Sequence, residues 1–195
     1  MGKLSVLKIP VFWAEGQPEI PPLGFTVRIG GLVERPLELD LERLAELATD
    51  AVSCRLTSVT RWSVRLQWRG ILARRFLEMA GPRAESRFVT FTSFGGRYAT
   101  AVRLQDLEHP CAIIALEAEG EPLPVEYGGP VRVVFPHLWG YKSAKSIVSI
   151  DFKERYEPGY WETRGYEGDA AIQATKLWDL NTRKTRAHDG GEVLW

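Results

Sequence analysis

The sequence predicts an α+β domain that contains more strand than helix. Short stretches in which apolar and polar residues alternate recur along the chain, as they do in half-buried strands. Only a few short segments have a helical pattern. The 12 prolines and 18 glycines indicate many irregular connections between these elements. A mixed fold in which short strands dominate follows from these observations.

The length fits one domain. A chain of 195 residues can bury one sizeable core, so we expect a single domain over 1–195. Four prolines and two glycines between residues 8 and 24 predict an irregular N-terminal arm over 1–24. The hydrophobic pattern weakens after Ala170, which predicts a peripheral tail over 176–195.

The first half of the domain is expected to begin with strand. Residues 25–29 alternate and end at Gly30, and residues 32–39 form a second extended piece. Asp40 is a good N-cap because its carboxylate can accept N–H groups of a first helical turn, and a short amphipathic helix follows at 41–47. Residues 51–60 alternate again, which places Cys54 and Ser58 on one face of a strand.

The second half combines a linker, a helix and the remaining strands. Residues 62–68, rich in Arg and Trp, are expected to be a linker, and a helix at 73–80 ends at Gly81. Residues 102–107 are expected to form a short link. The apolar run at 111–116 predicts a central, buried strand. The other expected strands are 88–92, 131–134 and 147–152.

Composition and motifs exclude several classes of function. The 25 basic and 25 acidic residues balance, so no overall electrostatic field favours binding of nucleic acid. The arginines and tryptophans at 61–69 could stack on bases, but tryptophans that fill the core and arginines that solvate its rim explain them better. The histidines and cysteines lack metal-site spacing, and no Gly-rich nucleotide loop or nucleophile elbow occurs. No segment predicts a membrane span or a signal core, and two cysteines do not predict disulfides, so we expect a cytoplasmic protein.

One turn has the features of an anion-binding site. It lies at 137–145, between two expected strands, and combines Gly140 and Ser143 with Lys142 and Lys145. Exposed backbone N–H groups and ammonium groups that converge on one point suit a phosphate. The alternative is a basic turn that faces solvent.

Five segments match the pattern of one family in the same order along the chain. They read GLVERPL at 31–37, VTRWS at 59–63 with WRGI at 68–71, GRY at 96–98 with LQDL at 104–107, EGEPLP at 119–124 with GGP and HLWGYKSAK at 128–130 and 137–145, and EPGYWETRGY at 157–166. Together they resemble the molybdopterin-binding domain of the sulfite-oxidase-like family, in its short bacterial and archaeal form. The resemblance implies that family's β-rich fold and a single pyranopterin that carries molybdenum.

The resemblance also implies residue roles. The turn at 142–145 would bind the pterin phosphate, and Phe12, Trp13 and Thr60 would shape the pocket. The implied cofactor-binding residues are Trp62, His137, Tyr141, Lys142, Ser143, Ala144 and Lys145. The implied catalytic residues are Ser58, Arg61 and Tyr98, with Ser58 in the position of the metal ligand.

Ser58 is where the chain departs from the family pattern. The family has a cysteine four residues before the tryptophan that corresponds to Trp62, and its thiolate binds molybdenum. Cys54 lies about 13 Å farther along an extended strand, so it cannot replace that cysteine without a bulge or a register shift. A neutral serine hydroxyl is a poor substitute for a soft thiolate unless it is ionised.

Three functions therefore stay open. The first is a molybdopterin-dependent oxidoreductase of the sulfite-oxidase type, which moves an oxygen atom or an electron pair on a small substrate and exchanges electrons with a separate partner. The second is a catalytically altered module that binds the pterin or another phosphate ligand. The third is a structural protein with a relic pocket.

Overall fold

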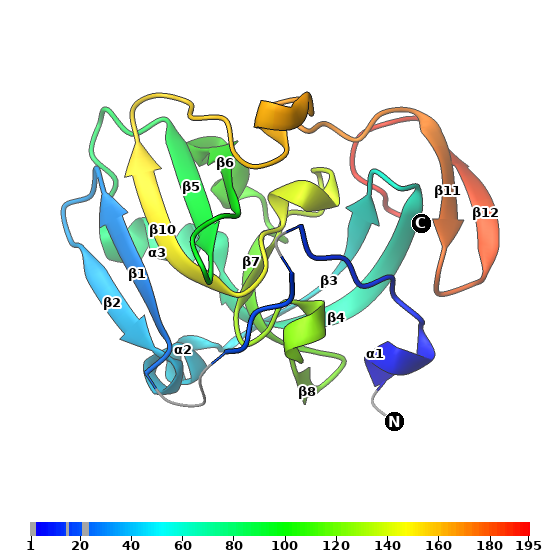
Figure 1. Cartoon of the computed structure of the whole chain (residues 1–195), viewed down its shortest axis with the longest axis horizontal. Coiled ribbons are helices and arrows are strands. Elements are labelled where there is room, and N and C mark those ends of the chain that lie inside the picture. Colours follow the sequence, from blue (N-terminus) through cyan, green and yellow to red (C-terminus); the bar gives the residue numbers. More distant parts are fainter. Residues whose placement is uncertain (1–2, 15, 21–23) are drawn as a thin grey trace.

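A five-stranded sheet forms one half of the molecule (Figure 1). The computed structural model describes residues 3–14, 16–20 and 24–195. In order across this sheet, the strands are β2 (Leu37–Asp40), β1 (Thr26–Gly31), β10 (Ile147–Lys153), β5 (Phe88–Ser93) and β6 (Ala99–Arg103). β1 and β10 are parallel, and the other neighbours are antiparallel. The strands expected at 25–29, 88–92 and 147–152 are confirmed.

The second sheet is built around one long strand, β4 (Trp62–Leu72). It pairs with β3 (Asp50–Ser58) from Trp62 to Gly70, and its second half also pairs with β7 (Ile113–Ala118). The remaining strands are β8 (Glu121–Pro122), β9 (Arg132–Val134), β11 (Thr175–Asp179) and β12 (Lys184–His188). The central strand expected at 111–116 is confirmed as β7.

The linker expected at 62–68 is wrong, because these residues are the first half of β4. Val64, Leu66 and Trp68 point into a core, whereas Gln67 and Arg69 are exposed. Residues 64–69 therefore alternate, and the outward positions Arg65, Gln67 and Arg69 are long and polar. The many arginines and tryptophans in this segment hid the alternating pattern of an ordinary amphipathic strand.

The peripheral tail expected at 176–195 is also wrong. Most of it forms the β11–β12 hairpin, which continues the second sheet through parallel pairing of Trp178 with Trp62 (Figure 1). Arg55 and Asp179 join the hairpin to β3 through a buried ion pair of 3.1 Å. Charged side chains at Lys176 and Asp179 of β11, and at Lys184 and Arg186 of β12, hid the pattern that would have predicted these short strands.

Two helices and four 3₁₀ turns complete the body of the domain. The helices are α2 (Leu41–Leu47) and α3 (Ala73–Ala80), and the turns are η1 (Leu104–Glu108), η2 (Val125–Tyr127), η3 (Gly140–Lys142) and η4 (Glu162–Arg164). The N-terminal arm contains one short helix, α1 (Lys3–Val6), and the rest of its described part is irregular. None of the helices in the described residues is long and apolar enough to span a membrane.

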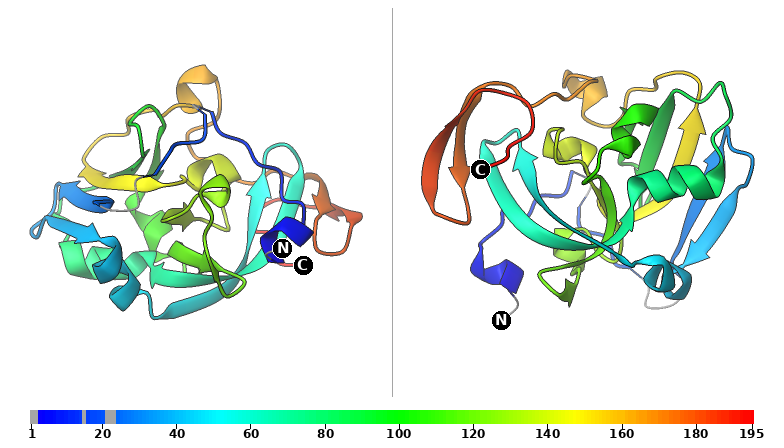
Figure 2. Two further views of the ribbon diagram at one scale, coloured as in Figure 1. Left: turned by 60° about the horizontal axis from the view of Figure 1, so that its bottom comes forward. Right: turned by 180° about the vertical axis from the view of Figure 1, so that it is seen from behind.

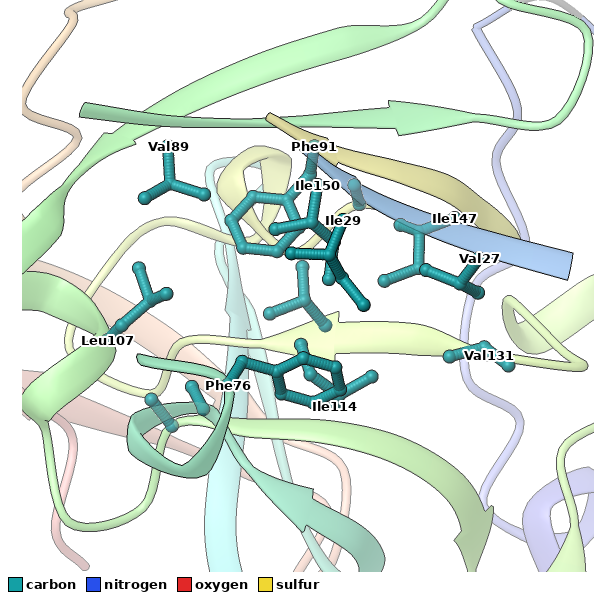
Figure 3. Close-up of a cluster of buried hydrophobic side chains, with 14 of the residues drawn as sticks. Val27, Ile29, Phe76, Val89, Phe91, Leu107, Ile114, Val131, Ile147 and Ile150 are labelled. Carbon is teal, nitrogen blue, oxygen red and sulfur yellow. The ribbon is translucent and has the colours of Figure 1, made fainter. Parts of the chain in front are cut away.

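The main core lies between the first sheet and α3. Figure 3 shows Ile29 and Ile150 facing Phe76 of α3 and Ile114 of β7. Figure 2 shows α3 on the opposite side of the molecule from the N-terminal arm. A second apolar cluster packs Leu56, Leu66 and their neighbours on β3, β4 and β7. The arm therefore crosses the face that α3 leaves open.

Asp40 caps α2 as expected, and its removal gives a modest, testable loss. Its Oδ1 accepts the backbone N–H of Arg43 at 2.8 Å. We expect Asp40→Ala to lower the free energy of unfolding by about 1 kcal/mol, because one N–H of the first turn loses its partner. Urea unfolding measures this, with Asp40→Asn as the control that keeps an acceptor. Equal midpoints for Asp40→Ala and the wild type would contradict the assignment.

Candidate active site

A cavity of about 550 Å³ lies where the N-terminal arm, the β3–β4 turn and the η3 turn meet. Its size is in the range that holds a drug-sized ligand or cofactor. Aromatic side chains dominate the walls: Phe12, Trp13, Trp62, Tyr98, Tyr127, Tyr141, Trp161 and Tyr166. Such walls suit a flat heteroaromatic ring system.

The β3–β4 hairpin places Ser58 and Thr60 on this cavity. The strands stay in register without a shift from Asp50 opposite Gly70 to Ser58 opposite Trp62. Arg61 has a φ of 67° and donates its N–H to the carbonyl of Ser58, which closes the turn. Ser58 Oγ accepts the N–H of Thr60 at 3.2 Å and lies 2.9 Å from Thr60 Oγ1.

The η3 turn and the residues after it form another wall of the same cavity. Gly140 allows the turn to approach β3 closely, because a Cβ there would lie 3.1 Å from the carbonyl oxygen of Thr57. Ser143 Oγ accepts the backbone N–H of Phe135 at 3.1 Å, which fixes the turn against the end of β9. Tyr141, Ser143, Ala144 and Lys145 then line the cavity.

Two cations, the buried Arg132 and the half-buried Lys145, contact this cavity without a carboxylate. Arg132 of β9 donates to the carbonyls of Tyr127 at 2.7 Å and Ser143 at 3.2 Å, but its buried Nε has no hydrogen-bond partner. Lys145 donates to the carbonyl of Phe12 at 2.8 Å. Neither side chain makes an ion pair with any residue that the structure describes. Two cations without a counter-charge on one wall suit an anion.

Burial lowers the pKa of both side chains, and the charge of Arg132 lowers that of Lys145 further. Burial lowers the pKa of Arg132 to about 10. Burial, and then the positive charge of Arg132, lower the pKa of Lys145 to about 7. An anion between them would reverse both effects, so the charge state of Lys145 depends on what occupies the cavity.

The expectation that both lysines of the turn converge on one anion is wrong. Lys142 is fully buried and points away from the cavity, where its Nζ donates to the carbonyl of Ala101 at 2.7 Å and to a carboxylate oxygen of Glu162. Thr100 Oγ1 donates to the same oxygen at 2.8 Å. A carboxylate from a distant turn therefore compensates this buried ammonium.

His137 and Arg61 also lie outside the cavity lining. His137 Nε2 is 3.2 Å from Asp106 Oδ1, and its ring stacks on His109 with the centroids 4.4 Å apart. The side chain of Arg61 is exposed on the hairpin turn. The other predicted site residues do line the cavity: Ser58, Trp62, Tyr98, Tyr141, Ser143, Ala144 and Lys145, with the shape-setting residues Phe12, Trp13 and Thr60.

Cys54 cannot reach this cavity. It is buried in the second core cluster, with its Sγ 3.8 Å from the carbonyl of Cys111, and burial raises the pKa of its thiol. Among the described residues, no cysteine lines the cavity, and no group of three or more His, Cys, Asp and Glu side chains could hold a metal ion. A metal here would therefore depend on ligands that its cofactor brings.

Comparison with known proteins decides the family. A profile of the oxidoreductase molybdopterin binding domain matches residues 14–161. The chain belongs to this family. It is 34% identical over 159 residues to the uncharacterized oxidoreductase YuiH of Bacillus subtilis, a match that covers 80% of this chain and 79% of YuiH. The sulfite-oxidase-like resemblance in the sequence is thus confirmed.

Other members of this molybdopterin-binding family are longer. The chain is 30% identical over 153 residues to the protein-methionine-sulfoxide reductase catalytic subunit MsrP of Campylobacter jejuni, which covers 70% of this chain and 52% of MsrP. It thus spans about half the length of that relative. The sulfane dehydrogenase SoxCD of Paracoccus pantotrophus has the same fold, with a TM-score of 0.68 and 16% identity over 90% of this chain and 47% of that one. The expected β-rich α+β fold is confirmed.

Arg132, Trp161 and Tyr166 are cavity residues that sequence reasoning missed. Arg132 did leave a signal, because it is the one charge inside the run Val131–Val134, which was expected to be a strand. A lone arginine in a buried strand needs a compensating partner or a ligand. The two aromatic residues lie in the segment at 157–166. This segment matches the family pattern, but its sequence does not indicate that it packs against the cavity.

Proposed function

We propose that this chain is a molybdopterin-dependent oxidoreductase of the sulfite-oxidase type, in which the aromatic cavity holds a single pyranopterin. The observation that carries the proposal is a pair of cations, the buried Arg132 and the half-buried Lys145, on one cavity wall without a carboxylate partner among the described residues. The unpartnered Nε of Arg132 and the low pKa of Lys145 both fit a wall that is completed by an anion.

The residues present fit such a cofactor at its phosphate end. Arg132, Lys145 and the backbone around Ser143 would hold the phosphate, and the aromatic walls would bind the pterin. When bound, the cofactor supplies the two-electron redox chemistry of molybdenum. Ser58 would face the metal, and Thr60 would hold the Ser58 oxygen in place through the two contacts at 3.2 and 2.9 Å. Tyr98 would border the substrate.

The relatives and the cavity walls support one substrate class. The MsrP subunits act on methionine sulfoxide in proteins, so a sulfoxide that accepts two electrons is the first substrate to test on this chain. Reduction with two electrons and two protons would convert the sulfoxide to a thioether and water, and aromatic walls make favourable contacts with the thioether sulfur of that product. A separate redox protein would supply the electrons. An artificial dye can replace it in an assay.

Metal and pterin content test the proposal directly. We expect about one molybdenum per chain, by mass spectrometry, in protein from a molybdenum-replete host, together with a fluorescent pterin after release. Pterin without metal would instead support an altered binding module. Absence of both would overturn the proposal.

Ser58→Cys tests the metal side of the site. A thiolate is a softer ligand than a hydroxyl, so we expect this variant to retain more molybdenum than the wild type during dialysis. Ser93→Cys is the matched control, because it places a thiol elsewhere in the same cavity. An equal gain in both variants, or a gain in neither, would remove Ser58 from the metal position.

A further inference from the structure

The N-terminal arm forms one entire wall of the cavity. All six residues from Ile9 to Ala14 line it. In Figure 1 the dark blue segment after α1 crosses the front of the molecule, between the two sheets. The cavity is therefore closed by a segment that belongs to neither sheet.

This wall is attached by side chains alone. Within the described residues, no backbone hydrogen bond joins residues 9–14 to the rest of the domain. Tyr160 donates its hydroxyl to the carbonyl of Ala14 at 3.1 Å, and the ring of Phe12 lies 5.9 Å from that of Trp161. Segments held without a backbone ladder open at lower free energy than strands do. Residues 9–14 are thus a strap rather than a fixed wall.

Lys145 is the charged contact between the strap and the body. Its Nζ donates to the carbonyl of Phe12 at 2.8 Å and lies 4.7 Å from the centroid of the Trp13 ring. Both contacts are strongest for the ammonium form, because a neutral amine is a weaker donor and loses the cation–π attraction.

The charge of Lys145 is in turn controlled from inside the cavity. The charged group that faces it is Arg132 of β9. Burial raises the pKa of Tyr127 and of Tyr141, which line the same cavity, so both are uncharged near neutral pH. Burial and Arg132 bring the pKa of Lys145 to about 7, so the empty cavity holds this side chain only partly charged under ordinary conditions. An oxyanion beside Arg132 would cancel the repulsion and restore the charge.

We propose that residues 9–14 are a strap that closes over an oxyanion, with Lys145 as the latch that senses it. An ammonium has three N–H donors, so Lys145 can bind the oxyanion and Phe12 together. Coupling of this kind is reciprocal: the oxyanion tightens the strap, and the closed strap binds the oxyanion more tightly. The identity of that oxyanion as the cofactor's phosphate rests on the proposed function, but the coupling itself does not.

Hydrogen exchange of the chain without cofactor tests the coupling. At pH 8.5, where the empty latch is mostly neutral, we expect saturating inorganic phosphate to slow amide exchange in residues 9–14 about tenfold, compared with sodium chloride of equal ionic strength. In Lys145→Met, exchange should be fast with either salt. Lys8→Met, which removes an exposed charge from the same arm, should behave as the wild type does.

Two results would overturn the coupling: exchange in the wild type that phosphate leaves unchanged or accelerates, or protection by phosphate that persists in Lys145→Met. If the variant does not fold, the wild-type comparison alone decides. Molybdenum content plays no part in this measurement, so a chain that never carries metal would refute the proposed function without touching the strap.

Discussion

Lys142→Met is expected to lower the free energy of unfolding by about 3–5 kcal/mol, because it leaves the carboxylate of Glu162 buried without a counter-charge. The two side chains are 1% and 3% exposed. The pair also connects η4 to η3 and β6, since Lys142 binds the carbonyl of Ala101 and Glu162 accepts the hydroxyl of Thr100. Chemical denaturation with a fluorescence readout measures the loss.

Lys145→Met is the matched comparison for this experiment. It is the same replacement three residues farther on, but Lys145 has no ion-pair partner among the described residues, so we expect a change within about 1 kcal/mol. The double variant Lys142→Met with Glu162→Gln removes the orphaned charge and should recover at least half of the loss. A single Lys142→Met variant as stable as the wild type would mean that the buried pair is not charged.

The different fates of the two lysines show what local sequence could predict. The composition of the turn correctly indicated a basic, tight segment, and η3 is such a turn. The direction in which the Lys142 ammonium points depends on Glu162, twenty residues later in the chain. Such a pairing is a tertiary event that no local pattern encodes.

Strand prediction succeeded where one face of a strand is buried and the other is plainly polar. β1, β3 and β5 alternate in that way and were expected, whereas β7 was expected from a continuous apolar run. It failed at β4 and β11, where arginine, lysine and tryptophan occupy the strand. Long amphipathic side chains cover apolar surface with their aliphatic stems. Their positions in the sequence therefore do not distinguish the buried face of a strand from the exposed face.

The cavity itself was predictable only through the ordered family pattern. Its walls come from the arm, the β3–β4 turn, β9 and the segment at 157–166, which lie far apart in the sequence. The pattern identified most of these segments, but it gave Arg132 no role. That omission matters because Arg132, rather than Lys142, is the second cation of the site.

Lys145→Met is accordingly expected to weaken cofactor binding, whereas Lys142→Met is expected to lower the free energy of unfolding. Removal of one charge-assisted contact to a phosphate costs about 1.5–3 kcal/mol, which weakens retention about 10- to 100-fold. The measurement is pterin and molybdenum per chain after extended dialysis. Arg132→Met should act in the same direction, and Lys8→Met should have no effect.

The effects of the two substitutions are distinguished by dividing the cofactor occupancy by the fraction of chains that are folded. Lys142 does not contact the cavity, so its loss should lower occupancy only in proportion to unfolding. Lys145 contacts the cavity and no buried carboxylate, so its loss should lower the occupancy of fully folded chains. Full occupancy in folded Lys145→Met would show that Arg132 alone can hold the phosphate, and would leave Lys145 only its contact with the arm.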